Sequence, residues 1–179
     1  LPICQFSPTS HTGIKTKSNP HGITDSPFIP TKLALGSGAT FIARIPDTNP
    51  KGMQAVFLAA ENHRGAPLVE ILQNCIIFND KTFGDVTGKD VKHDMQIHLE
   101  HGKPMVYGKE SDKGIILNGL KLEAVTIGEN GITEEDLLVH DAHEEDISLH
   151  MMIANMNVPE FPVAMGVIRS VKEVTFDEG

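Results

Sequence analysis

The chain has 179 residues, with 24 acidic and 15 basic side chains and a formal net charge of −9. This charge argues against a nucleic-acid-binding protein, because such proteins present a basic surface to the phosphates. Apolar residues make up 40% and charged residues 22% of the chain, which is typical of one globular domain. No window reaches the roughly 18 apolar residues of a membrane span, and no signal peptide opens the chain, so we expect a cytoplasmic protein without membrane contact.

The N-terminal segment is predicted to be a loop of at least 25 residues. It begins at Leu1 rather than at a methionine, and Pro8, Pro20 and Pro27 interrupt a run of Ser, Thr, Gly and His with no helical or strand period. A free loop of this length is normally disordered. We therefore expect either that it packs against another chain or that a segment precedes Leu1, and we favour the second.

The next stretch predicts a strand–helix–strand unit. After a short helix over Thr31–Gly38, the apolar run Ala39–Ile45 predicts a buried strand, and a helix follows from about Pro50. The run Ala66–Leu72 predicts a second buried strand, parallel to the first. Ligands in such sheets lie beyond the carboxyl ends of the strands, which is where Cys75 is expected.

The second half of the chain predicts an antiparallel appendage and a closing helix and strand. Residues 80–101 are polar and ambiguous, with a possible helix at Val91–Leu99. Residues 137–139 suggest a further strand. An acidic helix start follows Asp141, and the inner face of that helix is predicted to consist of Ile147, Met151, Met152 and Ala154. Residues 163–171 suggest a last strand or extended arm. Turn-rich spacing predicts the three short strands of the appendage at Lys103–Gly108, Gly114–Asn118 and Lys121–Gly128.

Several residues could carry chemistry. The densest set of potential metal ligands is His140, Asp141, His143, Glu144, Glu145 and Asp146, but a solvated acidic helix start explains these acids without a metal. The glycines around Ser37 precede a strand, so they lack the context of a phosphate loop. Of the two cysteines, Cys4 and Cys75, the second could be a core thiol, a nucleophile or a metal-cluster ligand.

A resemblance to a known family narrows these readings. The segments that carry it are Gln5–Ser10, Gly13, Thr16–Gly22, Pro27–Pro30, Leu33–Leu35, Gly38–Arg44, Leu68–Cys75, Phe78–Asn79, Leu138–Asp141 and Gly166–Arg169. In this order they resemble the β subunits of 2-oxoacid:ferredoxin oxidoreductases, and most of all the 2-oxoglutarate type. The match spans nearly the whole chain, so a chance likeness to one loop does not explain it.

The resemblance implies a thiamine-diphosphate enzyme with two kinds of subunit. Such an enzyme cleaves a 2-oxoacid to CO2 and an acyl-coenzyme A, and passes the electrons through a [4Fe-4S] cluster to ferredoxin. The implied fold is α/β: residues 1–79 would form the C-terminal half of a thiamine-diphosphate-binding domain with a parallel sheet. Residues 80–179 would form the C-terminal region of the β subunit, with its small antiparallel appendage. The implied partners are an α subunit, ferredoxin, the 2-oxoacid and coenzyme A.

The resemblance also implies roles for individual residues. Cys75 matches the late cysteine of the four that hold the cluster. Gln5, Ser7 and Thr9 would lie near thiamine diphosphate, because they would follow directly on the turn that binds Mg2+. That turn and the three early cysteines are absent from this sequence, so the chain alone should be inactive. It also departs from the family at Ile3–Cys4, where a basic residue and a glycine are usual, and at Ile76, where proline is common.

Two other classes stay open at this point. One is a cluster-free thiamine-diphosphate decarboxylase or synthase, for which Cys75 would be dispensable. The other is a non-catalytic assembly module, which the missing cofactor motif would permit. For the appendage, contact with another subunit or domain is the preferred role.

Overall fold

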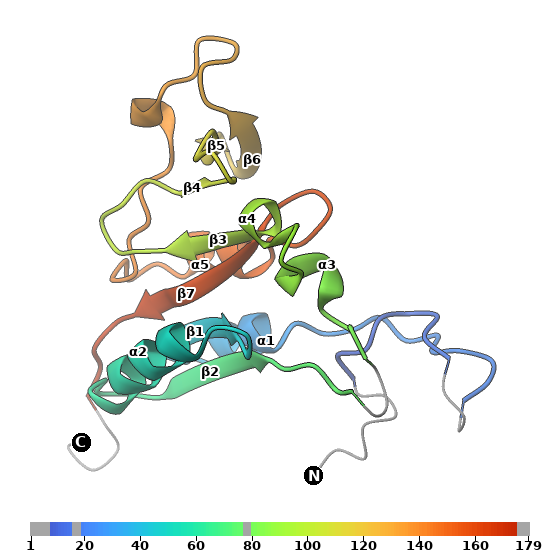
Figure 1. Ribbon diagram of the computed structural model, residues 1–179. Helices are drawn as coiled ribbons and strands as arrows, with labels where there is room; N and C mark the ends of the chain where they lie inside the picture. Colours follow the sequence, from blue (N-terminus) through green and yellow to red (C-terminus); the bar gives the residue numbers. More distant parts are fainter. Residues whose placement is uncertain (1–7, 16–18, 77–79, 175–179) are drawn as a thin grey trace.

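The computed structural model describes residues 8–15, 19–76 and 80–174, which form two sheets and several short helices (Figure 1). The helices are α1 (Pro30–Gly36), α2 (Pro50–Glu61), α3 (Gly84–Thr87), α4 (Lys92–Met95), η1 (Glu134–Asp136) and α5 (Ser148–Ala154). The strands are β1 (Phe41–Pro46), β2 (Pro67–Leu72), β3 (Gln96–Leu99), β4 (Val106–Tyr107), β5 (Lys113–Asn118), β6 (Lys121–Thr126) and β7 (Val163–Ser170). None of the helices in the described part of the chain is long and apolar enough to cross a membrane.

The main sheet is mixed, with a majority of parallel pairings. Its order is β2-β1-β7-β3: β1 and β2 are parallel, β3 and β7 are parallel, and β7 joins the two pairs by running antiparallel to β1. The predicted α/β class with a second, small antiparallel sheet is therefore confirmed. The sheet takes strands from both sides of residue 79.

The predicted strand–helix–strand unit is present, with one correction. All six residues of β1 are buried, as their apolar sequence predicts. Helix α2 begins where the Asn49 side chain accepts a hydrogen bond from the Gly52 N–H, and it covers the strands with Val56. Strand β2, however, is an edge strand with a half-exposed sequence, so the prediction that it is fully buried is wrong. Its apolar residues lie beside only one neighbouring strand.

Strand β7 changes partners along its length because it bends at a glycine. Gly166 has a φ of +94°, and a Cβ atom there would lie 2.9 Å from the Leu99 carbonyl oxygen, so the close approach of β3 favours glycine. Beyond it the register shifts by one residue at Ile168, which is fully buried. The strand predicted over residues 163–171 is thus confirmed as an element of the main sheet.

The helix predicted over Val91–Leu99 is wrong. One helical turn, α4, ends at Met95, and the chain continues as strand β3. Pairing with β7 buries Ile97 and Leu99, while the Gln96 side chain donates a hydrogen bond to the Val86 carbonyl oxygen. Tertiary pairing therefore outweighs the weak local helical pattern.

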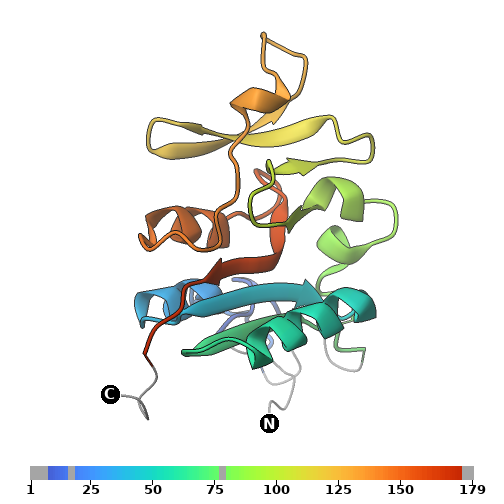
Figure 2. The same ribbon diagram turned by 90° about the vertical axis from the view of Figure 1, so that its left-hand side faces the viewer.

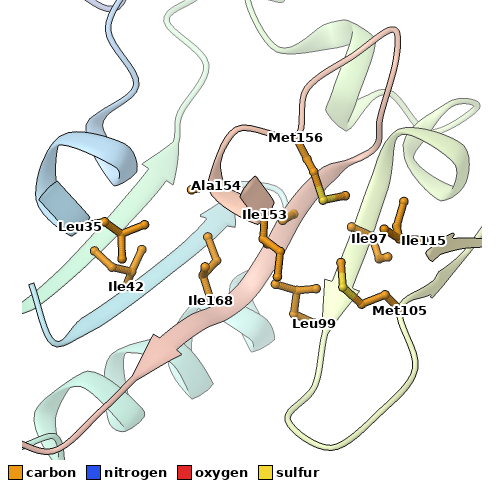
Figure 3. Packing of buried hydrophobic residues seen from close by; sticks show 11 residues of the cluster. Leu35, Ile42, Ile97, Leu99, Met105, Ile115, Ile153, Ala154, Met156 and Ile168 are labelled. Carbon is orange, nitrogen blue, oxygen red and sulfur yellow. The ribbon is translucent and has the colours of Figure 1, made fainter. Parts of the chain in front are cut away.

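The appendage forms as predicted and shares its core with the main sheet. Strands β4, β5 and β6 form an antiparallel sheet. One hydrophobic cluster joins this sheet to the main sheet, and Figure 3 shows its residues, which come from α1, β1, β3, β7, α5 and the appendage. Residues 137–139 are not a strand. They form a single bridge between Val139 and Pro104, and Leu138 exchanges backbone hydrogen bonds with Met105 and Ile115. A Cβ atom on Gly114 would clash with Leu137, so this segment covers the appendage closely.

The closing helix, α5, differs in part from its predicted inner face. Its buried residues are His150, Ile153 and Ala154, while Met151 and Met152 are half-buried and Ile147 is exposed. The acidic residues 144–146 precede the helix and are exposed, and the Asp146 carboxylate accepts a hydrogen bond from the Ser148 N–H. Figure 2 shows this helix on the side of the main sheet opposite to α2.

The described part of the N-terminal segment contains no helix or strand before α1, as predicted. It folds back on itself: the Gly13 N–H donates to the Ile23 carbonyl oxygen and the Ile23 N–H donates to the Ile14 carbonyl oxygen. The two sides approach so closely at Gly22, which has a φ of +90°, that a Cβ atom there would lie 3.1 Å from the Gly13 oxygen. Figure 1 shows this loop beyond the carboxyl ends of β1 and β2.

Candidate functional site

Cys75 lies three residues beyond strand β2, at the carboxyl edge of the β1–β2 pair. Its side chain is half-buried, and it is the only cysteine among the described residues. The other cysteine, Cys4, lies outside them. The turn that presents Cys75 is polar: the exposed Gln73 and the partly buried Asn74 precede it, and the highly exposed Ile76 follows it.

Two side chains bracket this turn. Asp47 follows β1 directly, and its Oδ2 atom accepts a hydrogen bond from the Asn74 N–H at 2.9 Å. The Asn74 side chain then reaches across the loop: its Oδ1 accepts from the Lys81 N–H at 2.8 Å, and its Nδ2 donates to Asp80 Oδ1 at 2.9 Å. Sequence reasoning did not assign these roles. The available signal was that Asp47 and Asn74 both follow the ends of neighbouring parallel strands.

Of the three residues predicted to lie near a cofactor, Thr9 belongs to the described residues. Gln5 and Ser7 lie outside the described residues. Thr9 is exposed in a turn at the start of the N-terminal loop, and the neighbouring Pro8 carbonyl oxygen accepts a hydrogen bond from the Phe28 N–H. The N-terminal loop lies at the end of the molecule to which the carboxyl ends of β1 and β2 point (Figure 1).

The histidine and acidic side chains of residues 140–146 do not converge on one metal site, and several of them form hydrogen bonds within the fold. His140 is buried and donates from Nε2 to the Val167 carbonyl oxygen, whereas His143 is exposed and contacts the Ser170 carbonyl oxygen. Asp141 is exposed, and its pKa is lowered first by the His143 N–H. Among the described residues, no group of three or more His, Cys, Asp or Glu side chains could hold a metal ion.

A buried cation that sequence reasoning missed stabilises this same loop. The Arg169 guanidinium donates to the Glu144 and Glu145 carbonyl oxygens at 2.7 and 3.0 Å, and to His150 Nδ1 at 3.0 Å. Since arginine can only donate, His150 must accept at Nδ1 and donate from Nε2 to the Asp141 carbonyl oxygen. Burial lowers the pKa of His150, and the Arg169 charge adds to that effect.

Two of the grooves on the surface of the described residues lie near the main sheet. One, of about 730 Å3, runs along the outer face of α2 from Asp47 past Met53 and Phe57 to Glu61. The other, of about 390 Å3, lies at the carboxyl ends of β3 and β7 and includes His101 and Ser170. Cys75 lines neither groove, although Asp47 connects its turn to the first.

No family model matches the chain, but individual proteins do. The chain is similar in sequence to β subunits of 2-oxoacid:ferredoxin oxidoreductases, which are subunits of oxidoreductase enzymes. It is 38% identical over 175 residues to the 2-oxoglutarate oxidoreductase subunit KorB of Mycobacterium tuberculosis, covering 97% of this chain and 46% of that protein. It is also 38% identical over 76 residues to the 2-oxoacid:ferredoxin oxidoreductase subunit beta of Saccharolobus solfataricus, covering 42% and 25%.

The fold agrees with these sequence matches. The structure is similar, with a TM-score of 0.63 and 20% identity, to 2-oxoglutarate:ferredoxin oxidoreductase from Magnetococcus marinus, a protein solved with 2-oxoglutarate, coenzyme A and succinyl-CoA bound. The match covers 97% of this chain and 44% of that chain. The chain therefore spans less than half the length of these two relatives.

Proposed function

We propose that this chain is part of the β subunit of a 2-oxoglutarate:ferredoxin oxidoreductase. The reaction would convert 2-oxoglutarate and coenzyme A to succinyl-CoA and CO2, with two electrons passing to two ferredoxin molecules. The observation that carries the proposal is the 38% identity to KorB over 97% of this chain. The neighbour of similar fold, which binds 2-oxoglutarate and coenzyme A, supports the substrate assignment.

The described residues fit one part of a [4Fe-4S] site. A cluster is held by cysteine thiolates, and the described part of the chain offers a single thiol, Cys75, on a well-braced turn. The Cys75 side chain is half-exposed, which suits a thiolate that contacts a cluster on one side and the protein on the other. We propose that Cys75 supplies one ligand and that the remaining ligands come from outside the described residues. A bound cluster would carry electrons one at a time to ferredoxin.

The proposed role of this chain toward thiamine diphosphate is positional. Gln5, Ser7 and Thr9 would contribute polar side chains near the cofactor, which supplies the carbanion chemistry of 2-oxoacid cleavage when bound with Mg2+. Thr9 is exposed, and the neighbouring Pro8 carbonyl oxygen accepts a hydrogen bond from the Phe28 N–H, which supports a position of this turn near a ligand. The α subunit and ferredoxin are the proposed protein partners.

The experiment compares iron and acid-labile sulfide in the complex purified anaerobically as the parent, Cys75→Ala and Cys4→Ala. We expect the parent and Cys4→Ala to be brown and to carry the same iron content, and Cys75→Ala to lose the cluster and ferredoxin reduction. Cys4→Ala is the matched control because it removes the other thiol of the chain.

Other outcomes would support other functions. A parent without iron that still cleaves a 2-oxoacid would indicate a cluster-free thiamine-diphosphate enzyme. A parent with neither iron nor thiamine-dependent activity would indicate an assembly module. A full cluster in Cys75→Ala would remove Cys75 from the ligand set while leaving the family assignment intact.

A further inference from the structure

We propose that Asp47 and Asn74 are positioning residues for Cys75, and that together they fix the turn that presents its thiol. The inference rests on the proposed function, in which Cys75 ligates a cluster. Neither residue is expected to touch the metal. Their effect would pass through the backbone that leads into and out of Cys75.

Asp47 ties this turn to β1, the strand that is buried along its whole length. Its own N–H donates to the Leu72 carbonyl oxygen at 3.1 Å, directly after the last paired residues of β1 and β2. Its carboxylate then accepts from the Asn74 N–H at 2.9 Å. The β1–β2 ladder is thereby extended by two hydrogen bonds, one from the backbone and one from a side chain. Because β1 is fully buried, its end is a fixed reference point for the turn.

Asn74 closes the turn from the other side. Its side chain uses both its acceptor and its donor, accepting from the Lys81 N–H and donating to Asp80. Lys81 has a φ of +60°, an unusual conformation for a residue with a side chain, and the hydrogen bond to Asn74 helps to hold it. Asp80 and Lys81 are thus held next to Asn74, the residue that precedes Cys75.

A thiolate that ligates a metal must be held within about 0.5 Å of its productive position, and outer partners that orient such ligands commonly change metal affinity by about 10- to 100-fold when removed. Cys75 is covalently linked to Asn74, so the Asn74 backbone conformation directs its Cα–Cβ bond. The Asn74 N–H donates to Asp47 and the Asn74 side chain accepts from the Lys81 N–H, so two hydrogen bonds restrain this residue. Their loss would let the thiol move away from the cluster.

The chemistry of the two side chains offers a sharp set of variants. Asp47→Ala removes the acceptor of the Asn74 N–H, whereas Asp47→Asn keeps an oxygen acceptor in the same place. Asn74→Ala removes both side-chain bonds across the loop. The matched control is Asp136→Ala, because Asp136 Oδ2 accepts a backbone N–H from Thr133 at 2.8 Å in the exposed turn of η1, without any link to Cys75.

The test uses the whole complex, purified anaerobically, with these four variants beside the parent and Cys75→Ala. The measurements are the rate of iron release to a chelator and the electron paramagnetic resonance spectrum of the reduced cluster. We expect about tenfold faster iron release and altered g-values in Asp47→Ala and Asn74→Ala, and parent-like behaviour in Asp47→Asn and Asp136→Ala. A purely structural role would lower the melting temperature without changing the spectrum.

A second readout separates this inference from the proposed function. The rate at which iodoacetamide alkylates Cys75 in the iron-depleted complex, followed by mass spectrometry of the Cys75 peptide, reports the presentation of the thiol independently of any cluster. We expect a severalfold difference between Asp47→Ala and Asp47→Asn. If the parent holds no cluster, or Cys75→Ala keeps one, the proposed ligand role fails and the alkylation rates still decide the positioning role. Identical iron release, spectra and alkylation in Asp47→Ala and Asp47→Asn would overturn the inference.

Discussion

Replacing Arg44 by alanine should destabilise the main sheet by about 3–5 kcal/mol, because it leaves a largely buried carboxylate without its cation. Arg44 Nε donates to Glu70 Oε2 at 2.6 Å, and the two side chains are 6% and 16% exposed. The Arg44 Nη2 atom also donates to Thr31 Oγ1 at 2.8 Å, so one guanidinium links β1, β2 and α1. A loss of this size lowers the folding equilibrium constant by about two to four orders of magnitude.

The assay is urea unfolding followed by circular dichroism, since the chain has no tryptophan to report fluorescence. The informative comparison is the double variant Arg44→Met with Glu70→Leu, which replaces both charges by apolar side chains of similar size. Such replacements are often neutral or stabilising, so we expect the double variant within about 1 kcal/mol of the parent. The reasoning is refuted if Arg44→Ala costs less than about 1 kcal/mol, or if the double variant is as unstable as the single one.

Two further predictions concern the buried histidines and the cofactor loop. Burial lowers the pKa values of His140 and His150 below the usual 6.5, so their contribution to the free energy of unfolding should be complete above pH 6.5 and should be lost as the pH falls below it. Urea unfolding at pH 7.5 and 5.5 measures this, and a pH dependence that His150→Gln leaves unchanged would contradict the role of His150. Thr9→Val should weaken thiamine diphosphate binding to the complex by roughly two- to tenfold in calorimetry, as expected for one lost hydrogen bond. Thr12→Val is the matched control, because the Thr12 hydroxyl donates to the Asp25 carbonyl oxygen instead, and equal affinities in the two variants would count against Thr9.

The elements that local sequence determines were predictable. The apolar run of β1 predicts burial on both faces and is buried along its whole length. The Asn118–Gly119 pair marks the tight turn between β5 and β6, where Gly119 adopts a φ of +61°. In both cases the information lies within a few neighbouring residues, so no distant contact is needed to decide the outcome.

The elements that depend on distant partners were not predictable. Strand β3 forms because Ile97 and Leu99 pair with β7, which lies more than 60 residues later in the chain. Arg169 looks like an ordinary residue near the end of a strand, yet it is 5% exposed and holds the loop around Glu144 and Glu145. A single buried arginine carries no periodicity in the sequence, so its partners appear only when the fold brings β7 and the loop before α5 together.

The candidate site combines both kinds of information. The sequence places Asp47 and Cys75 after two parallel strands, and the sheet then brings the strand ends together, as the general rule for such sheets predicts. The hydrogen bond between Asp47 and Asn74 depends on the register of β1 and β2, because the pairing of Pro46 with Leu72 sets the distance between the Asp47 carboxylate and the Asn74 N–H. A slip of one residue in this pairing would turn the Asp47 side chain to the other face of the sheet. The ion pair between Arg44 and Glu70, which joins directly paired residues of the same two strands, opposes that slip. The presentation of Cys75 therefore depends on a buried charge pair two registered positions away from the strand ends.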